Sequence, residues 1–313
     1  MKAPAPPARP VALAAAALLA VVAVLLGVTL TSGDDADSGG RGGARDIADG
    51  GLNADQRRRA DQLVSVFENG TTKIQYAYAE NLDDGRGVTA GRAGFTTNDG
   101  DALEVLRAYT DKKPDNPLAR FIPALQRLAD GESADGAEGA DGAGGSDGAE
   151  AGGSDGPRPR ALADADYIAA WKRAAADPAF REVQDAQVDD RYFTPALRAA
   201  DKAGLSSPLA VAELYDASIQ HGNGSDGDGL PALVRRTTAK VGTPAAAGEK
   251  AWLNAFFDVR VHDLTHPVNA DTADEWRTSV DRVEALRRLA EGGHRALDGP
   301  FTVTAFGSSY TIK

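Results

Sequence analysis

Apolar residues recur with helical spacing along most of the chain. Stretches in which apolar positions follow a period of 3.6 residues, with polar positions between them, predict amphipathic helices. These stretches are residues 54–69, 101–110, 117–129, 164–176, 208–220, 249–263 and 272–291. The pattern therefore predicts a mainly α protein.

Alternating apolar and polar positions, which are typical of strands, are confined to two short segments. One is residues 84–95, where an Asp-Gly pair supplies a turn, and the other is residues 301–312. Many helices with one small sheet near the front of the chain favour an α+β fold. We expect two helical lobes around a cleft.

The N-terminal segment has the pattern of an export signal. Lys2 and Arg9 precede an uncharged apolar run over residues 11–30, and polar, glycine-rich residues follow. Because this run is close to the roughly 20 residues that span a bilayer, residues 1–33 are expected to be either a signal peptide or a signal anchor. The protein is accordingly expected to be secreted, or anchored at the cell surface by residues 11–30.

Two further tracts lack the large apolar side chains of a packed domain. Residues 34–51 are mostly Gly, Asp, Ser, Ala and Arg and predict a disordered linker. Residues 131–159 repeat Gly, Ala, Asp, Glu and Ser and predict a disordered acidic insertion. The folded domain is therefore expected over residues 52–313, interrupted by this insertion.

Charge and composition narrow the classes of partner. The formal net charge of -12 argues against nucleic acid or an anionic membrane surface and favours a cationic partner. The chain has no cysteine, which excludes disulfides, thiolate metal sites and a cysteine nucleophile. Its 4 histidines are scattered, so we expect no metal and no cofactor.

A glutamate stands at an unusual position in the predicted helix 54–69. The apolar stripe of this helix ends at Phe67, and Glu68 follows at its edge, in the last turn before an Asn-Gly stop. Both the negative end of the helix dipole and partial burial favour the protonated carboxyl group, which a general acid requires. A solvated glutamate at a helix end is the alternative.

Sixteen positions further on, an aspartate is presented by a glycine-rich turn. The sequence Asp83-Asp84-Gly85-Arg86-Gly87 predicts a turn whose charged side chains are exposed rather than packed. By itself the turn could be a hairpin with solvated aspartates, and it lacks the further oxygen ligands of an EF-hand calcium loop. A glutamate at a helix end and an aspartate on a following strand and turn form the pair that glycoside hydrolysis needs.

Short motifs recur in a fixed order along the chain. They are Phe67-Glu68-Asn69, residues 75–78, Asp84-Gly85-Arg86-Gly87-Val88-Thr89, and residues 94–95, 100–104, 123–125, 171, 192–195, 215–217, 221–222, 253–260 and 310–312. In this order they resemble the chitosanases of glycoside hydrolase family 46. The resemblance covers nearly all of the chain from residue 52, apart from the acidic insertion.

The resemblance implies a lysozyme-like fold and a reaction. The family cleaves β-1,4-linked glucosamine polymers with inversion, which implies Glu68 as general acid and Asp84 as the base that activates water, helped by Thr89. Chitosan is then the expected partner, because carboxylates in the cleft would bind its ammonium groups. The protein is expected to act as a monomer.

Matching cleft positions imply contacts with the substrate. The residues concerned are Tyr78, Arg86, Gly94, Asp101 and His221. For Asp101 the alternative is that it orders the strand that carries Asp84, and for His221 the alternative is a structural role.

Three charged residues fall on the inner faces of predicted helices. Asp216 lies in line with apolar residues of helix 208–220, where an unpaired carboxylate would cost several kcal/mol, so it requires a partner. Arg260 and Arg282 lie on inner faces in the same way. The resemblance implies an Arg-Asp-Arg network behind the acid, and an ordinary buried salt bridge is the alternative.

The sequence also departs from the family pattern. A tryptophan after the catalytic helix has no counterpart in residues 70–74, Val88 replaces an aromatic residue, and Thr265-His266-Pro267 stands where an acidic residue is expected. These changes concern the affinity of subsites. They leave open a muramidase or a chitinase on the same scaffold, or a carbohydrate-binding protein that has lost turnover.

Overall fold

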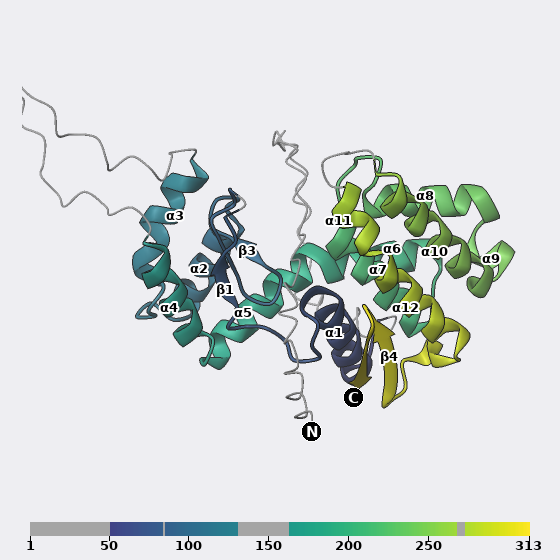
Figure 1. Cartoon of the computed structure of the whole chain (residues 1–313), viewed down its shortest axis with the longest axis horizontal. Coiled ribbons are helices and arrows are strands. Elements are labelled where there is room, and N and C mark those ends of the chain that lie inside the picture. The colour runs from purple at the N-terminus through teal and green to yellow at the C-terminus, as the bar shows by residue number, and fades with distance from the viewer. Residues whose placement is uncertain (1–50, 84, 131–162, 268–272) are drawn as a thin grey trace, which may run out of the picture.

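The computed structural model describes residues 51–83, 85–130, 163–267 and 273–313 (Figure 1). The predicted export segment, nearly all of the predicted linker, the acidic insertion and Asp84 lie outside the described residues. Within the described part of the chain, no helix is long and apolar enough to cross a membrane.

Helices make up most of the described structure, which confirms the predicted mainly α fold. They are α1 (Ala54–Asn69), α2 (Asp101–Lys112), α3 (Ile122–Ala129), α4 (Asp164–Ala174), α5 (Pro178–Val188), α6 (Thr194–Ala203), α7 (Pro208–His221), α8 (Leu230–Val241), α9 (Pro244–Ala247), α10 (Glu249–Thr265), α11 (Ala273–Thr278) and α12 (Val280–Glu291). Short 3-10 helices lie at η2 (Ala119–Phe121) and η5 (His294–Ala296), and a π-helix lies at η3 (Asp189–Phe193).

Two small antiparallel sheets complete the fold. One contains β1 (Ala79–Asn81), β2 (Val88–Ala90) and β3 (Phe95–Thr96), and the other pairs β4 (Phe301–Ala305) with β5 (Ser308–Ile312). The strands agree with the two predicted segments, except that β1 lies wholly before the first of them and was not predicted. The α+β class is confirmed, with the lysozyme-like fold of its structural relatives.

The elements form two lobes that lie side by side in Figure 1. We call residues 79–130 and 163–177, which hold the three-stranded sheet and α2 to α4, the sheet lobe. Residues 54–69 and 194–313, which hold α1, α6 to α12, β4 and β5, form the helical lobe. The chain passes between the lobes twice, through residues 70–78 and through α5 and η3.

Helix α1 is well defined at both ends. At its start Asn53 and Gln56 form a capping box, in which each side chain bonds the backbone of the other. At its end Gly70 takes a left-handed conformation with φ 62°, which favours glycine, and its N–H donates to the carbonyl of Val66. These features fix the helix that carries Glu68 at its C-terminal end.

Helix α7 is the centre of the helical lobe. Every residue from Leu209 to His221 is buried. Polar residues on this helix therefore require partners inside the protein, whichever face they occupy.

The apolar pattern did not predict α5, α6, α8 and α9. The buried face of α6 consists of Ala196, Leu197 and Ala200, which gives too weak an apolar signal to stand out. The predicted helix 272–291 is instead two helices that meet at Ser279. There the Ser279 hydroxyl donates to the carbonyl of Trp276 and accepts from Gln220, and such local side-chain bonds compete with helix continuation.

Candidate active site

Glu68 lies in the last turn of α1, as the sequence predicts, and it is not solvated there. The residue is 8% exposed, and its Oε1 lies 2.6 Å from Nη2 of Arg282 in α12. The alternative of a freely solvated helix-end glutamate is therefore wrong. The side chain is held in one direction by a charged partner.

Arg282 continues from Glu68 to a second carboxylate. Its Nε and Nη2 donate to Asp216 of α7 at 3.1 and 2.6 Å, and Nη2 of Arg260 in α10 donates to the same carboxylate at 2.6 Å. All three side chains are buried. The structure thus brings the three residues together behind Glu68, and their role in supporting a general acid stays a prediction.

The network contains further residues that the sequence analysis missed. Arg260 also donates to Glu213 at 2.9 Å and to Gln220 at 2.5 Å, and its Nε lies 3.3 Å from Nε2 of His221. A signal was present, because Glu213 and Gln220 lie three residues before and four after Asp216, on one side of a helix. We call these residues, with Glu68, Asp216, Arg260 and Arg282, the acid network.

Burial and charge act differently on the two carboxylates of α7. Burial raises the pKa of Glu213 to about 7, although Arg260 opposes the shift. Burial would also raise the pKa of Asp216, but the charges of Arg282 and Arg260 outweigh it and lower that pKa. The two carboxyl groups therefore differ in charge under mildly acidic conditions.

His221 lies inside the acid network. It is 4% exposed, and its ring packs edge-on against Trp276. Burial, together with the charges of Arg260 and Arg282, lowers its pKa well below the usual value, so the ring is neutral. This position favours the structural role over a contact with sugar.

The opposite side of the predicted site is the turn between β1 and β2. Asp84 itself lies outside the described residues, so its distance from Glu68 stays a prediction. Gly85 and Gly87 beside it have φ of 84° and 75°. A Cβ at Gly87 would lie 2.2 Å from Oγ1 of Thr97, so the turn requires glycine there.

Thr89 follows this turn in the central strand β2. Its side chain is fully buried, and its hydroxyl has no hydrogen-bond partner among the described residues. Buried hydroxyl groups are ordinarily bonded, so a ligand, a water molecule or a group outside the described part of the chain is expected to complete its bonding. Its role in positioning the attacking water stays a prediction.

Asp101 is the first residue of α2 and anchors the edge of the sheet. Its carboxylate accepts from the backbone N–H of Thr96 at 2.7 Å and of Ala102 at 2.8 Å. Thr96 pairs with Thr89 across the sheet, so Asp101 acts one strand away from Thr89. Burial raises the pKa of Asp101 to about 6, against these hydrogen bonds.

The remaining predicted contact residues surround the same turn. Tyr78 precedes β1 and donates to Glu80 at 3.4 Å, and Arg86 lies in the turn, where its carbonyl accepts from Asn98. Gly94 precedes β3 and has φ 68°. Their contacts with a substrate stay predictions.

Tyr192, in η3, relates the two sides of the site. Burial raises its pKa to about 12, and the negative charges of Asp101 and Glu68 add to the shift. The phenol is therefore close enough to both carboxylates to feel their fields. The sequence analysis included this residue in a motif and did not select it as a site residue.

Among the described residues, no group of histidine, aspartate and glutamate side chains could hold a metal ion. The described side chains of this site offer carboxyl groups, a hydroxyl and arginine. A buried, arginine-bound glutamate can transfer protons to or from a bound molecule.

Solved structures place this fold among the glycoside hydrolases. The crystal structure of native chitosanase from Bacillus subtilis MY002 matches with a TM-score of 0.68 and 46% identity, over 84% of this chain and 100% of that one. A Glu-to-Ala mutant chitosanase from the same organism, complexed with 6 GlcN, matches with a TM-score of 0.69 and 46% identity, again over 84% of this chain and 100% of that one.

The sequence places the chain within that class. It belongs to glycosyl hydrolase family 46, whose model matches residues 62–143 and 153–301. The chitosanase of Bacillus subtilis strain 168 is 48% identical over 255 residues, which are 81% of this chain and 83% of that protein. The chitosanase of Streptomyces sp. strain N174 is 32% identical over 259 residues, 81% of each chain.

The acid network makes a prediction for stability. Replacing Asp216 by Ala leaves Arg260 and Arg282 buried with one carboxylate fewer, which should lower the free energy of unfolding by about 3–5 kcal/mol. Denaturant unfolding measures the change. Asp55→Ala, which breaks an exposed ion pair on α1, should leave the midpoint almost unchanged. An unchanged midpoint in the Asp216 variant would contradict the inferred network.

Glu213 makes a prediction for pH. Its pKa is about 7 in the folded protein, compared with an ordinary value of 4.5. Between these two pH values the Glu213 carboxyl group is therefore protonated in the folded state and ionised in the unfolded state. The stability of the wild type should therefore fall as pH rises through this window, whereas Glu213→Gln lacks this loss. The melting temperature of Glu213→Gln relative to that of the wild type should therefore rise as the pH is raised from about 4 to about 8. A constant or decreasing difference would show that burial does not dominate at Glu213.

Proposed function

We propose that this chain is an endo-β-1,4-glycosidase that hydrolyses chitosan with inversion. We infer chitosan as the substrate from the 48% identity, over most of both chains, with a chitosanase. The matched crystal structure in complex with 6 GlcN supports a glucosamine polymer as the ligand.

In the proposed mechanism Glu68 is the general acid. It donates a proton to the glycosidic oxygen as the bond to the anomeric carbon breaks. Arg282 binds Oε1 of Glu68, which leaves Oε2 to face the substrate. Asp216 and Arg260 hold Arg282 in place, so three buried residues orient the Glu68 carboxyl group that donates the proton.

Asp84 is the proposed general base on the other side of the sugar. It removes a proton from a water molecule as that water attacks the anomeric carbon, and the hydroxyl of Thr89 helps to orient the water. The hydroxyl of Thr89, which is buried and has no hydrogen-bond partner among the described residues, supports this role. Inversion follows because water attacks the face opposite the leaving group.

Charge accounts for the choice of chitosan over chitin. Each deacetylated sugar carries an ammonium group, and the chain has a net charge of -12. Asp99 follows β3 and Asp101 begins α2, and both carboxylates accept from Thr96 of β3, so they add negative charge to the sheet lobe. A neutral acetamide gains nothing from this field.

The sequence analysis left open a muramidase, a chitinase or a carbohydrate-binding protein without turnover, and the match to glycosyl hydrolase family 46 and to several chitosanases favours a chitosanase over these. Release of reducing ends from chitosan, compared with chitin and peptidoglycan, separates these functions. We further propose that the enzyme is secreted or anchored by residues 11–30, and that it acts as a monomer.

The first prediction tests the catalytic pair. Glu68→Gln cannot donate the proton and Asp84→Asn cannot accept one, so each should lower the rate of reducing-end release from chitosan by roughly 100- to 10,000-fold. Both variants should still bind the polymer. Asp55→Asn, on the exposed face of α1, is the matched control and should keep its activity. Full activity in either amide variant would exclude that carboxylate from the reaction.

The second prediction concerns stereochemistry. Inversion of a β-linkage should give products whose new reducing end is first the α-anomer, which proton NMR detects before mutarotation. Azide should partly restore Asp84→Gly by taking the place of the missing carboxylate, with inversion preserved. A β-anomer appearing first would indicate a retaining mechanism instead.

A further inference from the structure

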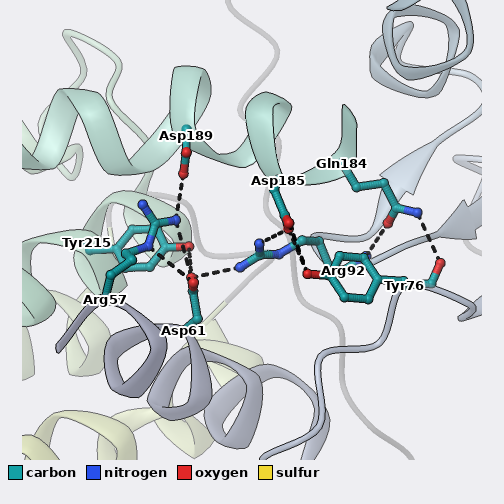
Figure 2. A network of polar contacts seen from close by, with 8 residues as sticks. All are labelled: Arg57, Asp61, Tyr76, Arg92, Gln184, Asp185, Asp189 and Tyr215. Atoms are coloured by element: carbon teal, nitrogen blue, oxygen red, sulfur yellow. Dashed lines mark hydrogen bonds and ion pairs between the residues drawn. The ribbon is translucent and has the colours of Figure 1, made fainter. Parts of the chain in front are cut away.

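A second network of polar side chains lies where the two lobes are joined, and Figure 2 shows it from close by. We call it the interlobe network. It consists of Arg57, Asp61, Tyr76, Arg92, Gln184, Asp185, Asp189 and Tyr215. None of these residues belongs to the acid network.

Arg92 is the residue that connects the lobes. It lies in the turn after β2, and its side chain is 6% exposed. Its Nη2 lies 2.7 Å from Oδ1 of Asp61 in α1, and its Nη1 bonds to Asp185 in α5. One guanidinium of the sheet lobe is thus bound both to the helical lobe and to the helix that joins the lobes.

The positions of the two partners along the chain relate this ion pair to the proposed catalytic pair. Asp61 and Glu68 lie seven residues apart on the same helix, a rise of about 10 Å along a rigid element. Arg92 follows Thr89 by three residues and Asp84 by eight. The ion pair therefore joins the helix that carries the proposed acid to the segment that carries the proposed base.

Both passages of the chain between the lobes are held by the same network. Tyr76, in the first passage, donates to Asp185 at 2.9 Å, and Gln184 donates to the carbonyl of Tyr76 at 3.2 Å. Gln184 also accepts from the backbone N–H of Arg92 at 3.1 Å. The second passage continues into the π-helix η3, a form of helix that is often found at functional sites.

Each charge in the network other than the half-exposed Asp189 has a second partner among the described residues. Asp61 also accepts from Arg57 at 3.2 Å and from Tyr215 at 3.0 Å, while Arg57 binds Asp189 at 2.6 Å. Removing a single side chain therefore leaves no buried charge alone. The protein should fold without the Asp61–Arg92 contact, so its effect on geometry can be measured.

Stability alone does not account for so many partly buried charges. A buried ion pair often contributes little net stability compared with apolar packing, because both charges must leave water, and in some proteins such pairs instead specify one geometry. Inversion requires the acid and the base to be separated by the width of a sugar and a water molecule. A displacement of about 1 Å can lower a rate 100-fold.

We propose that Arg92 and Asp61 are positioning residues. Their ion pair fixes the angle between the lobes, and it thereby fixes the separation between Glu68 and the turn that carries Asp84. This inference rests on the proposed function of Glu68 and Asp84 as a catalytic pair.

Kinetics of variants test the proposal. Arg92→Met should lower kcat for a glucosamine hexamer about tenfold to 100-fold, with KM changed less than about threefold, because the reacting groups are displaced while the binding surfaces remain. Asp61→Asn should act in the same direction, and Arg92→Lys should recover part of kcat because it keeps one ion pair. Arg236→Met is the matched control, since it breaks an ion pair with Asp263 within the helical lobe. It should lower the melting temperature and leave kcat unchanged.

A distance measurement tests the geometry directly. Because the chain has no cysteine, spin labels can be placed by Lys172→Cys in α4 and Lys250→Cys in α10, two exposed positions in different lobes. Electron–electron double resonance should give a broader or shifted distance distribution when Arg92→Met is added, and an unchanged one with Arg236→Met.

The outcomes separate this inference from the proposed function. A normal kcat in Arg92→Met and Asp61→Asn, or a lower kcat with an unchanged distance distribution, would overturn the positioning role. If Arg92→Met does not fold, Asp61→Asn and Arg92→Lys decide by the same criteria. Full activity of Glu68→Gln or Asp84→Asn would overturn the catalytic pair itself, whatever Arg92 does.

Discussion

Arg282 donates to two carboxylates of different helices, Glu68 of α1 and Asp216 of α7, at 2.6 Å each. A buried guanidinium needs such partners, because removing it from water costs several kcal/mol. Helices α1, α7 and α12 are therefore constrained to meet at one point. Arg260 adds α10 to the same point through Asp216 and Glu213. The orientation of Glu68 follows from this constraint, and so does much of the packing of the helical lobe.

The two networks differ in what they hold. The acid network fixes a side chain within one lobe, and its carboxyl groups outnumber its arginines, which is consistent with burial raising the pKa of Glu213. The interlobe network fixes one lobe against the other through Arg92 and Asp61. The proposed reaction needs two carboxyl groups at a set separation. The acid network orients the Glu68 side chain, and the interlobe network sets the distance between the two lobes that carry the proposed catalytic groups.

The sequence predicted those features of the fold and of the site that depend on residues close together in the chain. Helix 54–69 was predicted at both ends, because its apolar stripe is regular and an Asn-Gly pair stops it. The need of Asp216 for a partner was also local, since it lies on an apolar stripe. The Ala-rich helix α6 gave no such stripe. The contacts of Arg92 with Asp61 and Asp185 span 31 and 93 residues, and no spacing in the sequence indicates them.

The same contrast applies to the two halves of the site. Glu68 lies in the last turn of a 16-residue helix with defined caps, whereas the proposed base lies, in sequence, between the first two strands of a sheet whose strands have 3, 3 and 2 residues. So small a sheet is not stable by its own hydrogen bonds. Its position depends on groups at its edges, namely Asp101 at β3, Arg92 after β2, and the aromatic core around Trp171. The position of this sheet is thus set by tertiary contacts, while that of Glu68 is set largely by its helix. Substitutions far from the site should therefore act on the reaction mainly through the base.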